Sequence, residues 1–392
     1  MIEVLMDKRK KGIGEIIGKL RTEQKVTLEQ LSSGICTASE LSKIEQNRLE
    51  ADPFLLDRLF MRMGKSVERL EYVLSMENYK LYELRQKIQK SIAYRDLDLA
   101  EIQLNEYKEG KHITKSIHRQ YVFLEYAQIV WLGGEGEKAL NFIEKAIGET
   151  MPLNNALRSE TALSAEELKI LLFRCEICMD LGKKDDKSEI DEIIEYLYRK
   201  KIVQLEAVKA FPYAAFLYGK KYMGAELENG TLRKVTEAAL SLLRDTGKIL
   251  FLPEILEQYI GILKKDCGSR TFIDQLCLEK ESLVKIEKQY GINLDKCRMY
   301  EYVSRRFEID NELIRKTRIA FGITQEKLSE DICAQESLAR IESGKRSPRS
   351  GNLEQLMGKM GRNGERVSAV ITTGKYEILE LKHEFEKYVH RS

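Results

Sequence analysis

One stretch of this chain occurs twice, and corresponding positions differ by 297 residues without a gap. The first copy begins at Thr27 and reads TLEQLSSGICTASELSKIEQNR, and the second begins at Thr324 and reads TQEKLSEDICAQESLARIESGK. Between Glu15 and Glu45, 13 of 31 positions are identical to their partners. Stacked repeat arrays have periods of about 20–50 residues. Two copies so far apart therefore predict one small module used twice, with a different structure between them.

Each copy predicts short helices separated by a tight turn. In the first copy, Ile13, Ile17 and Leu20 recur at helical spacing and give the first helix an inner face. Thr27 and Thr37 precede the next two helices, each with Gln or Glu three residues later, which is the capping-box pattern. The third helix keeps small and polar residues on its outer face. This pattern is typical of a helix-turn-helix, whose second or recognition helix fits the DNA major groove.

The segment between the copies, from about Ser75 to Tyr300, predicts helices joined by short turns. Its clearest unit, HRQYVFLEYAQIVWLGGEGEKALNFIEKAIGE, contains two apolar helices separated by Gly133 and Gly134. The length of this unit fits the 34-residue tetratricopeptide period, and the whole segment has room for about six units. Stacked helix pairs form a curved solenoid with an extended concave face. No segment has a convincing strand pattern, so the predicted class is all-α.

Composition limits the other classes of protein. The chain is 43% hydrophobic and 33% charged, with five prolines and a net charge of +2, which indicates a folded, helix-rich chain. It has no signal-peptide pattern and no apolar run that could span a bilayer. Seven cysteines, an odd number, indicate reduced thiols. We therefore expect a cytoplasmic protein without a membrane partner.

Catalytic and cofactor chemistry has little support in the sequence. Cys175 and Cys178 form a single CxxC at helical spacing among apolar residues, which favours core packing over a metal or redox site. The four histidines match no metal-ligand spacing. We expect no enzymatic activity, no cofactor and no metal.

The motifs resemble known families. TQEKLS and SLARIESGKRSP in the second copy resemble the phage-repressor-like helix-turn-helix domains of the Cro/CI or XRE family. Together with the helical middle segment, GICTASELSKIEQN makes the chain similar to the bacterial peptide-pheromone receptors of the RRNPP group, which join such a domain to tetratricopeptide-like repeats. The resemblance implies a quorum-sensing transcription regulator of bacteria.

The resemblance also implies DNA-contacting residues. Gln325 would contact a phosphate, whereas Leu28 at the corresponding position of the first copy cannot. On the second reading face, Gln335 can read adenine and Arg340 can read guanine or contact a phosphate. The candidate DNA-contacting residues are Thr27, Thr37, Ala38, Ser39, Ser42, Lys43 and Arg48 in the first copy, and Thr324, Gln325, Gln335, Glu336, Ala339, Arg340 and Lys345 in the second.

By the same resemblance, the ligand of the solenoid would be a short secreted peptide taken back into the cell. Asparagine can pair with the backbone amides of a peptide, so asparagines and tyrosines are the side chains that we expect at a peptide site. The candidate ligand-binding residues are Tyr126, Asn141, Tyr218 and Tyr222, although core or ordinary surface roles remain an alternative for them.

Two functions stay open at this point. The chain is either a sequence-specific DNA-binding regulator with a ligand-sensing repeat domain, or a protein-interaction adaptor that uses these modules as docking or dimerisation surfaces. Double-stranded DNA and a peptide are the expected partners, and a homodimer is compatible with both functions. The expected fold is two lambda-repressor-like helix-turn-helix domains, over residues 1–72 and 306–370, flanking a tetratricopeptide-like α-solenoid over 73–305, with a final helix over 371–392.

Overall fold

The structure is a computed structural model, and it describes residues 13–67, 72–151, 162–183, 187–200, 202, 204–222, 229–266, 268–290 and 307–361. Within these ranges the chain forms the helices α1 to α19, one short 3-10 helix (η2, Lys111–Thr114) and two strands of three residues each. The predicted all-α class is confirmed. None of the described helices is long and apolar enough to cross a membrane. The predicted final helix over 371–392 lies outside the described residues.

The repeated stretch forms the same four helices twice. The N-terminal module consists of α1 (Ile13–Glu23), α2 (Leu28–Ser32), α3 (Ala38–Glu45) and α4 (Pro53–Arg62). The C-terminal module consists of α16 (Asp310–Ala320), α17 (Gln325–Ser329), α18 (Gln335–Glu342) and α19 (Ser350–Lys359). Every helix boundary of the second module lies 297 residues after its partner in the first. The alignment of the sequences therefore extends to the fold.

Local capping explains where these short helices begin. The side chains of Thr27 and Thr37 accept backbone hydrogen bonds at the starts of α2 and α3, and both predicted capping boxes are present. Thr324 caps α17 in the same way. Ala334, which replaces the second threonine, provides no side-chain cap for α18. The C-terminal module thus lacks one local interaction that the N-terminal module has.

An identical ion pair closes both modules. The guanidinium of Arg21 donates from Nε and Nη2 to the two carboxylate oxygens of Glu45, at 2.6 and 2.8 Å. Arg318 makes the same two bonds to Glu342, at 2.6 and 2.9 Å. Such a bidentate pair fixes geometry as well as adding stability. It holds the first helix of each module against the end of the third, which explains why both residues occur in both copies.

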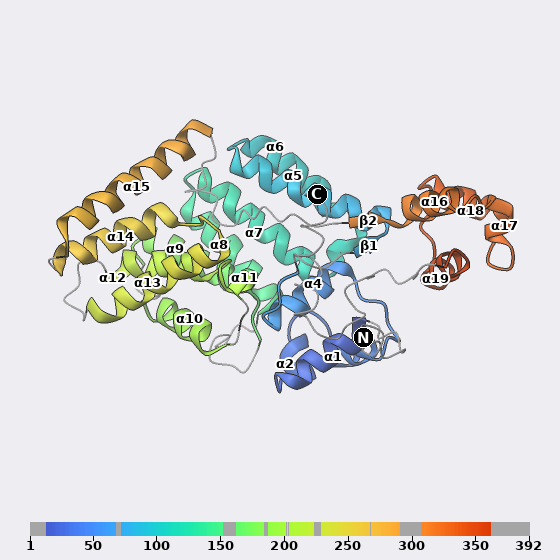
Figure 1. Ribbon diagram of the computed structural model, residues 1–392, viewed down its shortest axis with the longest axis horizontal. Helices are drawn as coiled ribbons and strands as arrows, with labels where there is room; N and C mark the ends of the chain where they lie inside the picture. Colours follow the sequence, from blue (N-terminus) through green and yellow to red (C-terminus); the bar gives the residue numbers. More distant parts are fainter. Residues whose placement is uncertain are drawn as a thin grey trace, which may run out of the picture.

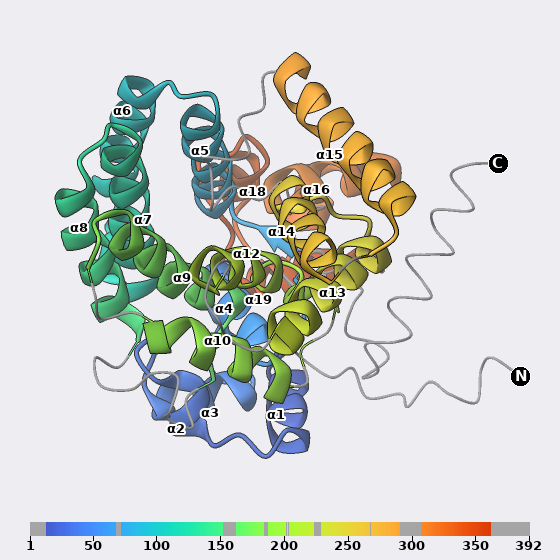
Figure 2. The same ribbon diagram turned by 90° about the vertical axis from the view of Figure 1, so that its left-hand side faces the viewer.

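The middle segment is a curved stack of helices that runs from α5 round to α15 (Figure 2). Its helices are α5 (Met76–Ala93), α6 (Leu97–Lys108), α7 (Ser116–Leu132), α8 (Gly136–Thr150), α9 (Ala165–Asp180), α10 (Lys187–Arg199), α11 (Gln204–Ala207), α12 (Phe211–Tyr222), α13 (Asn229–Thr246), α14 (Leu252–Lys265) and α15 (Arg270–Tyr290). We call this stack the solenoid. The described helices form five neighbouring pairs, with the single turn α11 between α10 and α12, whereas the sequence predicted about six units.

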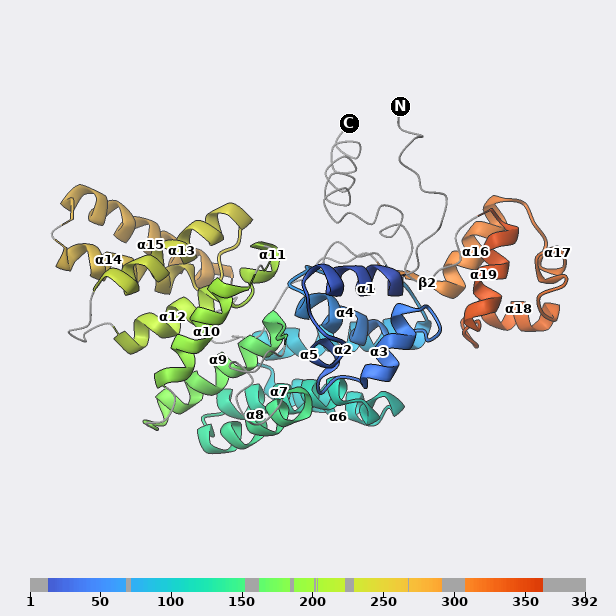
Figure 3. The same cartoon turned by 90° about the horizontal axis from the view of Figure 1, so that it is seen from below.

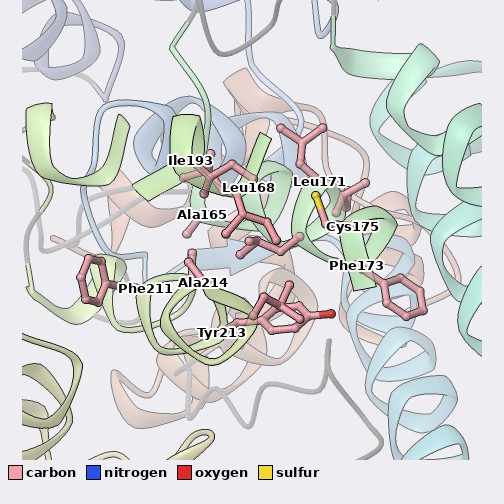
Figure 4. Packing of buried hydrophobic residues seen from close by; sticks show 14 of the residues in the cluster. Ala165, Leu168, Leu171, Phe173, Cys175, Ile193, Phe211, Tyr213 and Ala214 are labelled. Atoms are coloured by element: carbon pink, nitrogen blue, oxygen red, sulfur yellow. The ribbon is translucent and has the colours of Figure 1, made fainter. Parts of the chain in front are cut away.

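A large apolar cluster holds the middle of the solenoid together. Leu168, Phe173 and Tyr213 lie fully buried at its centre, contributed by α9 and α12 (Figure 4). Cys175 and Cys178 are also buried here, so the core role predicted for the CxxC pair is confirmed.

Two short strands pair the segment after the N-terminal module with the segment before the C-terminal module. β1 (Tyr72–Leu74) follows the N-terminal module, β2 (Phe307–Ile309) leads into α16, and the two pair in parallel (Figure 1). The sequence analysis missed them, because three residues are too few to show an alternating pattern. Through this strand pair the C-terminal module is attached at one end of the molecule (Figure 3).

The two modules differ in how their cores connect to the rest of the chain. The apolar core of the N-terminal module continues into Tyr72 and Leu74 of β1 and Ile117 of α7. Among the described residues, the core of the C-terminal module contains only side chains from its own helices and turns. The N-terminal module is therefore packed as part of the solenoid, and the C-terminal module is packed as a separate body.

Candidate functional site

The C-terminal module presents a polar face on α18. Leu338 and Ile341 bury the inner side of this helix, with 0% and 2% of their surfaces exposed. Because a helix repeats every 3.6 residues, the other side then faces solvent. Five of the predicted contact residues lie on or near this side. Gln335, Glu336, Arg340 and Lys345 are exposed, and Ala339 is half-buried. The structure therefore brings this group of candidates together.

A basic loop extends this face. Lys345, Arg346 and Arg349 lie in the turn between α18 and α19, and all three are exposed. None of them pairs with a carboxylate in the part of the chain that the structure describes. Three unpaired cations beside a recognition helix suit the phosphate backbone of DNA. Our sequence analysis missed Arg346 and Arg349, although the run KRSPR is visible in the sequence.

The equivalent loop of the N-terminal module has the opposite sign. Arg48 is its one basic residue, and Glu50 and Asp52 are acidic. Asp52 caps α4 by accepting a hydrogen bond from the Phe54 amide and also pairs with Lys115 of the solenoid at 2.6 Å. The two modules therefore differ most in charge at the place where a phosphate backbone would run.

The two residues at the start of the second helix have internal partners. The side-chain amide of Gln325 donates from Nε2 to Glu342 Oε2 at 2.7 Å. Gln325, the predicted phosphate contact, therefore also supports the Arg318–Glu342 pair. Leu28, at the corresponding position, packs against the core of its own module. Thr27 and Thr324 are exposed and act as caps.

The outer face of α3 in the N-terminal module is open to solvent. Thr37, Ser39, Lys43 and Arg48 are exposed, and Ala38 and Ser42 are half-buried. The turn that precedes α3 contacts the solenoid. Ser116 of α7 donates to the Gly34 carbonyl oxygen at 2.9 Å, and a Cβ atom on Gly34 would lie 2.3 Å from the carbonyl oxygen of Thr150.

A buried arginine fastens the N-terminal module to the solenoid. Arg62, at the end of α4, donates to the carbonyl oxygens of Leu31 and Ser33 in its own module, at 2.9 and 2.7 Å. The same guanidinium donates to the Thr150 carbonyl oxygen and forms a bidentate pair with Glu167, at 2.6 and 3.1 Å. Both side chains of that pair are fully buried. One residue therefore joins α2, the end of α8 and the start of α9.

The pKa of Glu167 reflects this pairing. Burial alone raises the pKa of a carboxyl, but Arg62 and the neighbouring Arg58 outweigh the burial and lower it to about 2. Arg58 also donates to Gln120 and Glu166, both at 2.8 Å. We call Arg58, Arg62, Gln120 and Glu167 the junction network.

The C-terminal module has only half of this arrangement. Lys359 takes the place of Arg62, and its amine donates to the carbonyl oxygens of Lys327 and Glu330, at 3.2 and 2.5 Å. It thus fastens the fourth helix to the second, as Arg62 does inside its own module. Lys359 is exposed, and it lacks the planar fork that lets Arg62 bind a second set of partners.

A cavity of about 160 Å³ lies beside the junction network. It is lined from α4, α5, α7 and α9, and its charged or strongly polar lining includes Asp57, Arg58, Arg85, Gln120, Glu125, Glu166, Lys169 and Lys209. Arg85 lies over the rings of Phe54 and Tyr121, 4.3 and 4.1 Å from their centroids.

One carboxyl of the cavity has a raised pKa. Glu125 is fully buried, and this burial raises its pKa to about 8. Gln128 donates to one carboxylate oxygen, whereas Oε1 has no hydrogen-bond partner among the described residues.

The predicted ligand-binding residues lie elsewhere. Tyr126 donates to Asn105 and stacks on Phe142, and Asn141 is exposed on α8. Tyr218 and Tyr222 lie together on α12, where the Tyr222 hydroxyl donates to Asp191. None of the four lines the cavity, and the structure does not bring the two groups together.

No group of three or more His, Cys, Asp or Glu side chains is placed to hold a metal within the described ranges. One of the four histidines, His118, is buried beside Tyr107 and Phe54. This burial, followed by the charge of Arg85, lowers the pKa of His118 to about 2.

Comparison with known proteins gives one family match. Residues 314–365, most of the C-terminal module, match the family described as Helix-turn-helix. This segment is therefore a helix-turn-helix domain, the class whose recognition helix lies in the DNA major groove. A structure of Bacillus thuringiensis PlcR in complex with the peptide PapR7 and DNA is similar at 16% identity and a TM-score of 0.41, over 73% of this chain and 100% of that one. No curated protein matches the chain.

Proposed function

We propose that this chain is a cytoplasmic DNA-binding transcription regulator whose C-terminal module makes the main contact with DNA. The observation that carries the proposal is the basic loop of Lys345, Arg346 and Arg349 beside the open face of α18, in a domain that matches the helix-turn-helix family. Phosphate contacts supply most of the affinity of such domains, and base contacts supply the specificity. Gln335 and Arg340 are the proposed base readers, with Glu336 and Ala339 beside them.

The N-terminal module is the proposed second, weaker DNA contact. Its α3 face is open, and Ser39, Ser42 and Lys43 are the residues that would meet the bases. Leu49 and the acidic Asp52 occupy the positions of Arg346 and Arg349, and Glu50 adds a second negative charge to this loop. Two unlike reading faces on one chain fit an operator with two unlike half-sites.

The solenoid is the proposed sensor, and a short peptide is the proposed ligand. The cavity beside the junction network supports this role, because it combines apolar rings with cations and the unsatisfied oxygen of Glu125. Ligand sites commonly pair an apolar lining with a few directed polar groups. At about 160 Å³, the cavity has room for one or two side chains of a peptide, while the remainder would lie along the concave face.

A docking role is the alternative for the N-terminal module. It is favoured by one observation: Asp57, Arg58 and Arg62 of α4 are buried against the solenoid, whereas their counterparts Glu354, Gln355 and Lys359 are exposed. In this alternative the first module has become a structural joint, and the second alone reads DNA.

Selection from random duplexes at moderate salt tests the proposal. Three full-length proteins are compared: the unchanged chain, Gln335→Ala with Arg340→Ala, and Ser39→Ala with Lys43→Ala. We expect a split motif in which each double variant blurs a different half. If the second double variant changes nothing, the N-terminal module is a joint and not a reader. If no motif emerges, with or without added peptide extracts, the proposal is wrong.

Salt dependence separates phosphate contacts from a protein interface. Replacing Lys345, Arg346 and Arg349 with alanine should reduce the slope of log affinity against log salt by about 1 for each contact removed. Arg48→Ala in the N-terminal module is the matched control, with an expected change of about 1 or less. Equal slopes in all three proteins would contradict the assignment of the main contact to the C-terminal module.

A further inference from the structure

A buried carboxylate links the N-terminal module to β1, the strand that pairs with the one leading into the C-terminal module. Asp57 of α4 is 7% exposed and accepts a hydrogen bond on each of its oxygens. The hydroxyl of Tyr72 in β1 donates to Oδ1 at 2.8 Å, and the hydroxyl of Tyr82 in α5 donates to Oδ2 at 2.7 Å. One side chain therefore fixes three elements relative to one another.

The strand pair passes this position on to the C-terminal module. Tyr72 pairs with Phe307, and Leu74 pairs with Ile309, the residue directly before α16. There is no linker between β2 and the first helix of the module, so the direction of the strand sets the direction of α16. Figure 1 shows α4, β1, β2 and α16 following one another in space.

The duplicated sequence indicates that this arrangement is not needed for the module itself. Glu354 occupies the position of Asp57 in the C-terminal module, and it is exposed. The fold of the module thus forms without a buried carboxylate here. A buried, charged acceptor is costly to keep unless its partners are held in place. Asp57 also lines the cavity next to Arg58, so the position of the strand is set at the wall of the proposed sensor site.

We propose that Asp57 and Tyr72 are positioning residues that set the orientation in which the C-terminal module meets DNA. Through α4, the N-terminal module fixes the position of the C-terminal module, in addition to any contact of its own with DNA. The DNA part of this inference rests on the proposed function, but the positioning itself is a property of the free protein.

The first test measures the strand pair in the full chain without DNA. Tyr72→Phe removes the hydroxyl that reaches Asp57 and keeps the buried ring. We expect amide hydrogen exchange in the segment Phe307–Ile309 to become about tenfold faster, because a hydrogen bond to a charged group is lost at the support of β1. Tyr82→Phe is the matched control, since it removes the other bond to Asp57 without touching the strand. Equal acceleration in both variants, or in neither, would overturn the proposal.

The second test measures orientation. Spin labels on non-natural residues at the exposed positions Glu29 of α2 and Gln355 of α19 report the distance between the modules. We expect a broader distance distribution in Tyr72→Phe and Asp57→Asn than in Tyr82→Phe, with unchanged helical content. A distribution as narrow as that of the unchanged chain would show that Asp57 and Tyr72 support only local stability.

The third test uses the operator selected by the unchanged chain. We expect Tyr72→Phe to bind a duplex with only the half-site of the C-terminal module as well as the unchanged chain does, and to bind the full operator about tenfold more weakly. Equal affinity of both proteins for the full operator would overturn the link to DNA. Failure of the proposed function is distinct, because then the unchanged chain itself selects no operator while the first two tests still report on the strand.

Discussion

The N-terminal and C-terminal modules have helices of equal length, the same closing ion pair and the same contact between the fourth helix and the carbonyl oxygens of the second. Their fourth helices differ in surroundings. The outer side of α4 carries charged residues that are buried against the rest of the chain, whereas the outer side of α19 faces solvent. The loop before α19 is basic, and the loop before α4 is mainly acidic. The same fold thus lies in two different surroundings, and residues outside the shared core make the difference.

The largest expected difference concerns Arg62 and Lys359. Arg62→Ala leaves Glu167 buried with Arg58 alone, and we expect a loss of about 3–5 kcal/mol in the free energy of unfolding. Lys359→Ala removes two exposed hydrogen bonds and should cost about 1 kcal/mol. Urea unfolding followed by circular dichroism measures both, and the fluorescence of Trp131 in α7, the single tryptophan of the chain, follows the solenoid to which Arg62 is fastened.

Arg62→Lys is the matched control for this pair. It copies the C-terminal module, so it should keep the bonds to α2 and lose the bidentate contact with Glu167. We expect an intermediate loss of stability. If Arg62→Ala and Lys359→Ala cost the same, the junction network does not distinguish the modules.

Acid should weaken the junction network. The pKa of Glu167 is lowered from 4.5 to about 2 in the folded protein. A lowered carboxyl pKa contributes stability that is fully present above pH 4.5 and is lost as the pH falls towards 2, on the order of 3 kcal/mol. The stability reported by Trp131 should therefore fall across this window. Glu167→Gln should be less stable at pH 7 and should show a flatter acid profile; an unchanged profile would contradict the pairing.

Swapping the residues at the turn before the third helix should have a smaller effect on stability, and mainly in the N-terminal module. Gly34 has φ +73° and touches Thr150, whereas its counterpart Asp331 has φ +63° and is exposed. Gly34→Asp should cost about 2 kcal/mol, because a Cβ atom collides with the solenoid backbone. Asp331→Gly should change stability by less than about 1 kcal/mol, since relief of backbone strain offsets added freedom of the unfolded chain. Thermal unfolding of both variants measures the two changes in stability. Equal losses of stability would mean that the turn of the N-terminal module is not docked on the solenoid.

The smallest expected effect concerns the cap of the recognition helix. Thr37→Ala should cost about 1 kcal/mol, because it removes a capping box. Ala334→Thr should add a similar amount to the C-terminal module, which has no side-chain cap at this position. Hydrogen exchange of α3 and α18 measures the two changes separately. No gain from Ala334→Thr would indicate that α18 is stabilised by its packing alone.

The sequence predicted the local structure of both modules closely. Thr27 and Thr37 are caps, and Ile13, Ile17 and Leu20 pack in the core of the module, as their spacing indicated. These features depend on neighbours within one or two helical turns, so a single sequence carries them. The open faces of α3 and α18 follow from the same periodicity, which is why most of the predicted DNA-contacting residues are exposed.

The ligand residues and the attachment of the modules were beyond this kind of inference. Tyr126 and Tyr218 were chosen by residue type, and the cavity is instead lined by side chains such as Arg85 and Glu125 from other faces of the helices. Charged residues are usually solvent-exposed, so nothing in the sequence marked Arg62 as buried.

By itself the sequence determined that this chain has two copies of one helix-turn-helix fold around a helical stack, because helix periodicity, caps and duplication are written in short stretches. Only the tertiary structure decided which copy is fixed to the solenoid and which is held by a strand. Arg62 and Glu167 are 105 residues apart, and Tyr72 pairs with Phe307 over more than twice that separation. Contacts of this kind depend on complementary surfaces that form only after the helices have packed.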